Sequence, residues 1–137
     1  MKTLSEALWN KFSAVDINSV HTDLYIATKG QLYKERAKQN AILPYVVYHI
    51  ISDVPEWNFC SDFEKVRIQF DLYSEANSST EVEDLYAKLK SLFDWQTLTI
   101  VGWDHVYMKR ELARLSRDPT EDVWTYNADY EIFLEKQ

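Results

Sequence analysis

The chain has 137 residues, a size typical of one domain, and its 46% apolar content argues against a disordered chain. Its net charge of −7 argues against binding to duplex nucleic acid, because that affinity comes from Lys and Arg contacting phosphates. The single cysteine, Cys60, excludes a disulfide framework within the chain and indicates a reducing compartment. We find no signal peptide and no apolar run long enough to cross a membrane, so no membrane partner is expected.

The first 40 residues predict one helix followed by irregular segments. Thr3 and Glu6 fit a capping box, and apolar side chains then recur on one face, so a helix is predicted from Thr3 to about Ala14. The next segments are predicted as a polar connector, a short strand with a turn, and an exposed loop, at residues 16–22, 24–33 and 34–40 respectively.

Two strands are predicted in the middle of the chain. Residues 45–51 follow Pro44 as a β-branched run that is apolar on both faces, which is typical of a central strand. Residues 52–62 are interpreted as a connector. In residues 65–73 apolar and polar side chains alternate strictly, which predicts a strand with one face in the core and one in solvent.

A second helix and two further strands complete the prediction. A Ser- and Thr-rich cap precedes residues 81–93, whose apolar side chains have helical spacing. Strands are predicted at residues 98–112 and 123–134, with a turn at residues 116–122 between them. Runs of strands without alternating helices predict an α+β fold, a mostly antiparallel sheet of about four to five strands packed against two helices, in a single domain over residues 1–137.

The sequence predicts no catalytic, cofactor or metal site. Cys60 and His49 are a conceivable nucleophilic dyad, but no family signature surrounds Cys60, and a small core or loop cysteine is the favoured interpretation. His21, His49 and His105 lack the spacing of metal ligands, so structural or surface histidines are expected. The two glycines are isolated, which excludes a Gly-rich phosphate loop.

Two regions are candidate contact surfaces for other proteins. One is the predicted connector, where bulky rings either fold back on the core or face a partner. The other is the basic stretch 109–117, which is followed by the acidic stretch 118–137. This asymmetry suits head-to-tail contact between copies, or else ordinary solvated faces. The interface residues predicted from these regions are Trp57, Phe59, Lys109, Arg110, Arg114 and Arg117.

The segment Leu43-Pro44-Tyr45-Val46-Val47-Tyr48 resembles a strand of the tail-completion, or tail-terminator, proteins of long-tailed bacteriophages and related prophage elements. The resemblance includes an opening helix, a strand like residues 66–73, a helix after a Ser- and Thr-rich cap, and two closing strands. It spans nearly the whole chain. The chain departs from the family in residues 23–39, where members often carry a Gly-rich turn.

The resemblance implies a virion structural protein without catalytic residues or cofactors. It implies a homo-oligomeric ring, a hexamer, at the head-proximal end of the tail, made in the cytoplasm of the bacterial host. The ring would end tail polymerisation, contact the tail tube protein and the head-completion or neck protein, and let DNA pass through its lumen without specific binding. The acidic composition is compatible with that passage, because negative charge repels phosphate.

Two alternatives stay open at the level of sequence. One is a head–tail adaptor or neck protein of similar fold. The other is a small cytoplasmic enzyme or ligand-binding domain with a pocket between sheet and helices, for which the candidate lining residues are Tyr48, His49 and Trp103.

Overall fold

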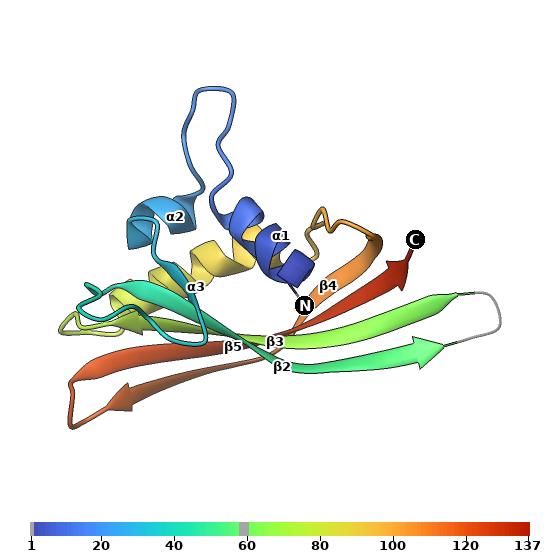
Figure 1. The fold of residues 1–137 in the computed structure, drawn as a ribbon. Coiled ribbons are helices and arrows are strands. Elements are labelled where there is room, and N and C mark those ends of the chain that lie inside the picture. Colours follow the sequence, from blue (N-terminus) through green and yellow to red (C-terminus); the bar gives the residue numbers. More distant parts are fainter. Residues whose placement is uncertain (1, 58–60) are drawn as a thin grey trace.

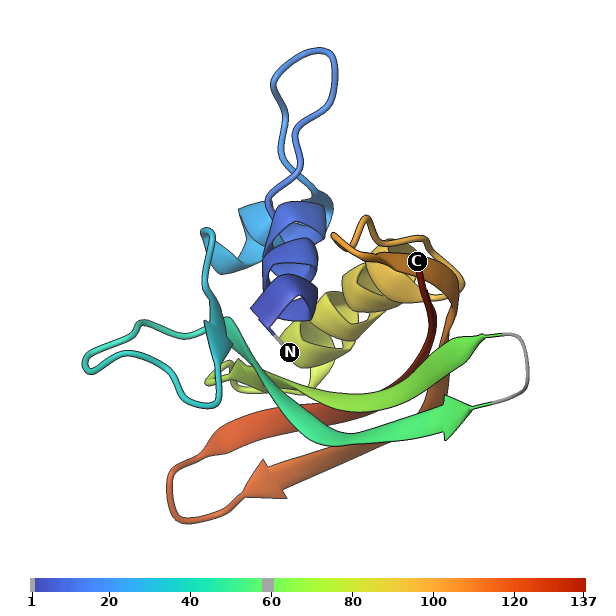
Figure 2. The same cartoon turned by 45° about the vertical axis from the view of Figure 1, so that its right-hand side comes forward.

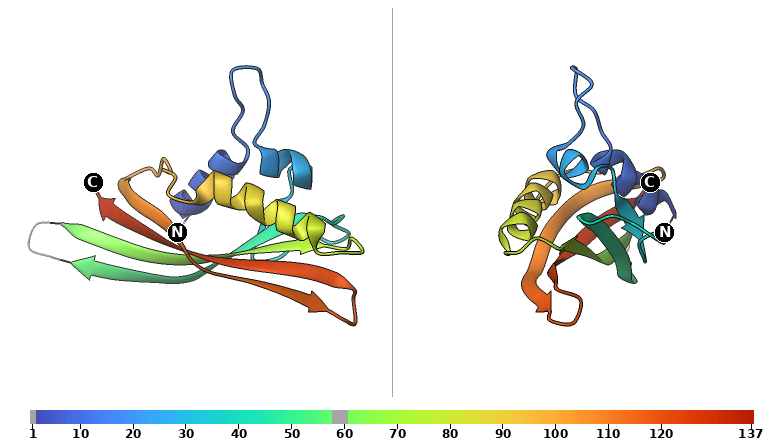
Figure 3. Two further views of the ribbon diagram at one scale, coloured as in Figure 1. Left: turned by 180° about the vertical axis from the view of Figure 1, so that it is seen from behind. Right: turned by 90° about the vertical axis from the view of Figure 1, so that its left-hand side faces the viewer.

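The computed structural model describes residues 2–57 and 61–137 and has an α+β fold, as predicted. One sheet carries three helices on a single face (Figures 1 and 3), so the prediction of two helices is wrong. The elements in chain order are α1 (Lys2–Phe12), α2 (Asp23–Thr28), β1 (Leu32–Lys34), β2 (Tyr45–Trp57), β3 (Asp62–Ser74), α3 (Thr80–Phe93), β4 (Trp103–Asp118) and β5 (Val123–Lys136).

The sheet has five strands in the order β1-β2-β3-β5-β4. β1 runs parallel to β2, and every other neighbouring pair is antiparallel, which confirms the mostly antiparallel prediction. The β2–β3 and β4–β5 hairpins extend toward opposite ends of the sheet (Figure 1). The sheet is curved, with its hollow side toward the helices (Figure 2).

The core lies between the helices and the covered face of the sheet. The apolar stripes predicted for α1 and α3 are buried, and they comprise Leu4, Leu8 and Phe12, and Val82, Leu85, Leu89 and Phe93. The Phe93 ring stacks on Phe70 of β3 with 4.8 Å between centroids. Tyr130 of β5 contacts both rings and donates its hydroxyl hydrogen to Asp94 at the end of α3. These contacts fix α3 against the centre of the sheet.

Helix α2 stands where the sequence predicts a short strand. Thr22 caps this helix, since its Oγ1 accepts a hydrogen bond from the Tyr25 N–H at 3.3 Å. Gly30, with a φ of +75°, turns the chain toward β1, and a Cβ there would lie 2.9 Å from the Tyr25 ring. A helix of six residues is too short to show helical periodicity, so the sequence pattern gave no signal for it.

Two predicted boundaries also differ from the structure. Residues 52–62 are mostly strand, because β2 continues to Trp57 and β3 begins at Asp62. β4 begins at Trp103 and continues to Asp118, so the strand predicted at residues 98–112 is displaced toward the chain end. Both strands contain bulges, which interrupt the alternation of side chains that the sequence prediction used.

Candidate functional site on the open face of the sheet

Among the described residues, one face of the sheet carries no helix, and we call it the open face (Figure 3). Along β3 this face is the polar face predicted from the sequence, and its residues are Lys65, Arg67, Gln69, Asp71 and Tyr73. The residues of β2, β4 and β5 that stand opposite them in the register complete the surface. Two polar networks and two groups of aromatic rings order this face.

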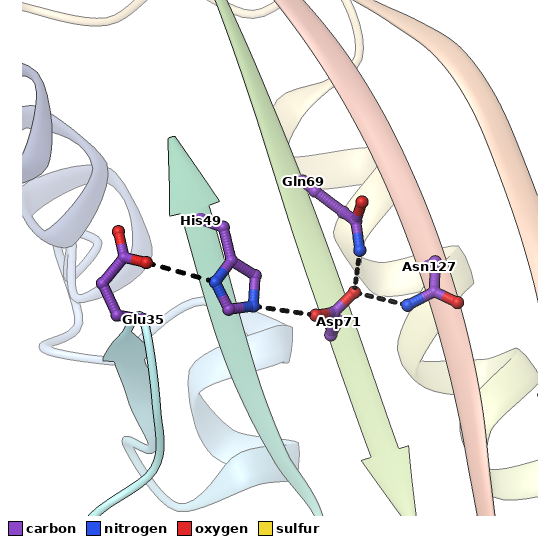
Figure 4. A network of polar contacts seen from close by, with 5 residues as sticks. All are labelled: Glu35, His49, Gln69, Asp71 and Asn127. Atoms are coloured by element: carbon purple, nitrogen blue, oxygen red, sulfur yellow. Dashed lines mark hydrogen bonds and ion pairs between the residues drawn. The ribbon is translucent and has the colours of Figure 1, made fainter. Parts of the chain in front are cut away.

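Asp71 is the centre of the first polar network (Figure 4). Its residue is only 5% exposed, and its carboxylate lies 3.0 Å from His49 Nε2. Gln69 donates a hydrogen bond to it at 2.7 Å, and Asn127 donates another. Glu35 approaches the other nitrogen of His49 at 3.3 Å. A buried carboxylate needs such donors because an unpaired charge is costly to bury, so the network fixes these side chains across β2, β3 and β5.

The second network is made of ion pairs. Glu131 of β5 lies between Lys65 and Lys109, at 3.7 and 3.5 Å from their ammonium nitrogens. Lys65 also pairs with Glu56 at 3.0 Å, and Lys109 pairs with Glu111 at 3.2 Å. These contacts raise the pKa of Lys65, chiefly through Glu56, and the pKa of Lys109, chiefly through Glu111. The network therefore links β2, β3, β5 and β4 by charge.

Aromatic rings lie at both ends of the open face. Toward the β2–β3 hairpin, Phe133 stacks with Phe63 and with Tyr107, at centroid distances of 5.1 and 5.4 Å. Toward the other end, Tyr45 contacts Tyr73 at 5.3 Å. Cross-strand ring pairs stiffen a sheet and present large amphipathic area, which is typical of protein contact surfaces.

Residues 13–22 form a loop that projects away from the helices and the sheet (Figure 1), and we call it the projecting loop. The Asp16 carboxylate accepts hydrogen bonds from the Asn18 and Val20 N–H groups, so the loop is braced by its own contacts. Ile17 is 98% exposed at its tip, and Val15 is also exposed. The sequence predicts only a polar connector here, since isolated apolar residues between polar ones give no periodic signal.

Of the two aromatic residues predicted to contact a partner, the structure describes one. Trp57 ends β2 and is 73% exposed, so its ring does not fold back on the core. Phe59 lies outside the described residues, as does Cys60 of the conceivable Cys60–His49 dyad. The contact role of Trp57 and Phe59 stays a prediction.

The predicted basic residues all lie on β4 but face two sides of the sheet. Lys109 and Arg114 stand on the open face, opposite Glu131 and Asn127 in the register. Arg110 pairs with Asp94 at 3.4 Å, at the C-terminal end of α3. Arg117 forms an ion pair with Asp122 across the turn, and its guanidinium lies 5.7 Å from the Trp124 ring.

The basic and acidic stretches are partners within one chain. β4 carries the basic residues, β5 carries much of the acidic stretch, and the two strands are neighbours. The Lys109–Glu131 and Arg117–Asp122 pairs satisfy part of the charge asymmetry internally. Within the part of the chain that the structure describes, Arg114 makes no ion pair.

The pocket expected under the enzyme alternative is not formed by its candidate residues. Tyr48 is buried in the core against Phe70, whereas its neighbour His49 points to the open face. Successive strand residues face opposite sides, so these two cannot line one pocket. Trp103 packs against the core at the start of β4. The described surface has a shallow hollow of about 550 Å³ elsewhere, between α1 and Lys34.

Each histidine has its own structural contact. His21 Nδ1 lies 3.0 Å from the Ser13 carbonyl oxygen, and His105 Nδ1 accepts the Leu98 N–H at 2.9 Å. Burial lowers the pKa of His105. Over residues 2–57 and 61–137, no group of three or more potential metal ligands is found. No helix among these residues is both long and apolar enough for a membrane span.

The covered and open faces define an ordered α+β domain whose polar surface is suited to contact with other proteins. The sequence matches the family of tail completion protein gp17 over residues 21–135. The chain therefore belongs to this family and is a structural protein of the phage tail or neck, which confirms the predicted resemblance.

Solved structures with a similar fold were also found. The chain is similar to a chain from the virion of the native gene transfer agent (GTA) particle, with a TM-score of 0.81, 11% identity, and 96% of this chain and 94% of that chain covered. A second solved chain has a TM-score of 0.58, 11% identity, and 99% and 94% coverage. At this identity both likenesses concern the fold. The search of curated proteins found no match.

Proposed function

We propose that this chain is a tail terminator, which forms a hexameric ring at the head-proximal end of the phage tail. The observation that carries the proposal is the family match over residues 21–135. That range contains α2, α3 and the whole sheet apart from the last residue of β5. The proposal thus rests on the elements that build the open face, and not on an isolated motif.

The structure supports a role in assembly in two ways. The open face is ordered by its own polar networks before any partner binds, so a partner would lose little side-chain entropy there. The projecting loop offers an exposed apolar tip away from that face. A molecule with distinct ordered surfaces can contact several partners at once, as a protein between tube and head must.

The proposed mechanism is surface capping. The ring covers the growing end of the tube, which stops addition of the tail tube protein, and it presents another surface to the head-completion or neck protein. DNA passes through the lumen without specific contacts, since a chain of net charge −7 repels phosphate. The fold likeness to a chain of a gene transfer agent virion is consistent with a place in such a particle.

Electron microscopy of growing tail tubes tests this proposal. The chain would be added to the polymerising tail tube protein of the same genome, with tubes grown without the chain as the control. We expect ring-shaped density at one end of each tube and no growth from that end. Tubes that lengthen as in the control, with both ends bare, would contradict the terminator role. Binding to the head portion alone would indicate the head–tail adaptor instead.

A further inference from the structure

Two strand edges of the sheet lack a partner strand over most of their length. β4 is the last strand of the sheet, and on its outer side the described chain gives backbone contacts at Trp103, which donates its N–H to Ile100, and at Met108, which accepts the Trp95 N–H. β2 has β1 beside it only at residues 46–48. Residues 49–57 of β2 therefore form a second free edge. Free edges of this length invite pairing with another strand.

Exposed apolar side chains gather on these two edges. On β2 they are Ile51, Val54 and Trp57, which are 53%, 50% and 73% exposed. On β4 they are Leu112 and Leu115, which are 60% and 36% exposed. The charged residues of these edges and Pro55 discourage indiscriminate strand pairing, whereas the exposed apolar side chains between them point to one specific partner.

The charges of the two edges are complementary. Residues 109–117 of β4 carry four cations and one acid, whereas residues 51–57 of β2 carry Asp53 and Glu56 and no cation. Arg114 makes no ion pair among the described residues. Asp53 lies against the Glu64 carboxyl, and this contact adds to the burial that raises the pKa of Glu64 to about 7. A cation from outside would relieve this repulsion.

Strand direction also allows the two edges to meet. β2, β3, β5 and β4 alternate in direction, so β2 and β4 are antiparallel to each other. A second copy that continues the sheet with the same face outward would place its β2 antiparallel to β4 of the first copy. Pro55 has no N–H and interrupts any long hydrogen-bond ladder at this edge, so the side chains must supply much of the specificity.

We propose that the partner of each edge is a second copy of this chain, with the β4 edge, residues 109–117, docked on the β2 edge, residues 51–57, of the next copy. The contact is heterologous, and a heterologous contact forms a ring where its repeated rotation closes, as the proposed terminator requires. The apolar side chains form its centre, and Arg114 and Arg117 of one copy face Asp53 and Glu56 of the other. This inference rests on the proposed ring and names its subunit interface.

Charge reversal on one edge at a time tests the interface. Variant one carries Arg114→Glu and Arg117→Glu, and variant two carries Asp53→Lys and Glu56→Lys. Each variant alone brings like charges together, and we expect its self-association to weaken on the order of 100-fold. In a one-to-one mixture every contact again joins opposite charges in an alternating ring, so assembly should return. Light scattering after size exclusion, and rings at tube ends in electron micrographs, are the two readouts.

Matched controls carry the same charge changes away from both edges. Lys29→Glu with Lys38→Glu corresponds to variant one, and Glu83→Lys with Asp84→Lys corresponds to variant two, all at exposed positions. Both controls should assemble like the wild type, and circular dichroism checks that every variant is folded.

The outcomes separate this interface from the terminator role. If folded edge variants assemble like the wild type, or if their mixture does not restore assembly, the proposed interface is contradicted. The proposed terminator role is unaffected by that result. If the wild type forms rings that depend on these charges but leaves tube growth unchanged, the proposed terminator role is contradicted. The proposed interface is then supported. A wild type that assembles neither in solution nor on tubes contradicts both.

Discussion

Asp71 shows how a single buried charge organises the open face. The carboxylate sits between His49, Gln69 and Asn127, which come from three neighbouring strands. Its position could be read from the sequence only as one polar residue in an alternating strand. The register of β2 and β5 against β3 decided that these four side chains would meet.

Replacing Asp71 with alanine should destabilise the fold. The change leaves three polar side chains without their acceptor in a partly buried site, and we expect a loss of about 1–3 kcal/mol in the free energy of unfolding. Urea denaturation measures it. Asp129→Ala on the same face is the control, since the Asp129 side chain forms no hydrogen bond within the described residues, and a similar loss there would contradict the role of the network.

The raised pKa of Glu64 makes the free energy of unfolding depend on pH. Burial, together with Asp53, raises its pKa from 4.5 to about 7, so the folded state holds a proton that the unfolded state has lost across this window. The free energy of unfolding should therefore fall as pH rises from 4.5 to about 7. Glu64→Gln removes this group, and its unfolding free energy should depend less on pH there than that of the wild type.

Denaturation curves across that pH window provide the measurement for Glu64. Glu83→Gln, at an exposed position of α3, is the matched control and should keep the wild-type slope. If the free energy of unfolding depends on pH in the same way for Glu64→Gln and the wild type, Glu64 does not cause the pH dependence.

At the scale of elements, α3 is the helix that the sequence predicted best. Its periodic stripe is long enough to be recognised, and the stripe is buried as expected. Leu89→Ala should cost about 2–5 kcal/mol of unfolding free energy, because Leu89 is fully buried and a cavity would remain. Ser91→Ala, at an exposed position of the same helix, should change the free energy of unfolding by less than about 0.5 kcal/mol in the same urea experiment.

In the projecting loop, a contact with a partner can be tested without changing the free energy of unfolding. Ile17 is 98% exposed, so Ile17→Asp should leave the free energy of unfolding within about 0.5 kcal/mol of the wild type. We expect the same variant to lose attachment to tail tubes in a sedimentation assay, because an exposed apolar side chain on a braced loop is suited to partner contact. Asn18→Asp in the same loop is the control. Undiminished attachment of the Ile17 variant would exclude the loop as a contact.

At the scale of the whole molecule, all three helices and all five strands contribute to one cluster of buried side chains. This continuity predicts that residues 1–137 unfold as a single domain. Far-ultraviolet circular dichroism and the fluorescence of the five Trp residues should give coincident urea transitions. Two separated transitions would contradict the single-domain prediction.

The sequence alone determined the α+β class, the α1 and α3 stripes, the alternating strands and the family resemblance, because periodic burial is written directly in residue order. It could not show α2, which is too short to be periodic, or the full lengths of β2 and β4, which bulges disguise. Only the tertiary structure decided that the basic β4 pairs with the acidic β5 and that Asp71 gathers its donors. It also decided which strand edges stay free. The physical reason is that register and strand order join residues far apart in the chain, and these long-range contacts have no local signal in the sequence.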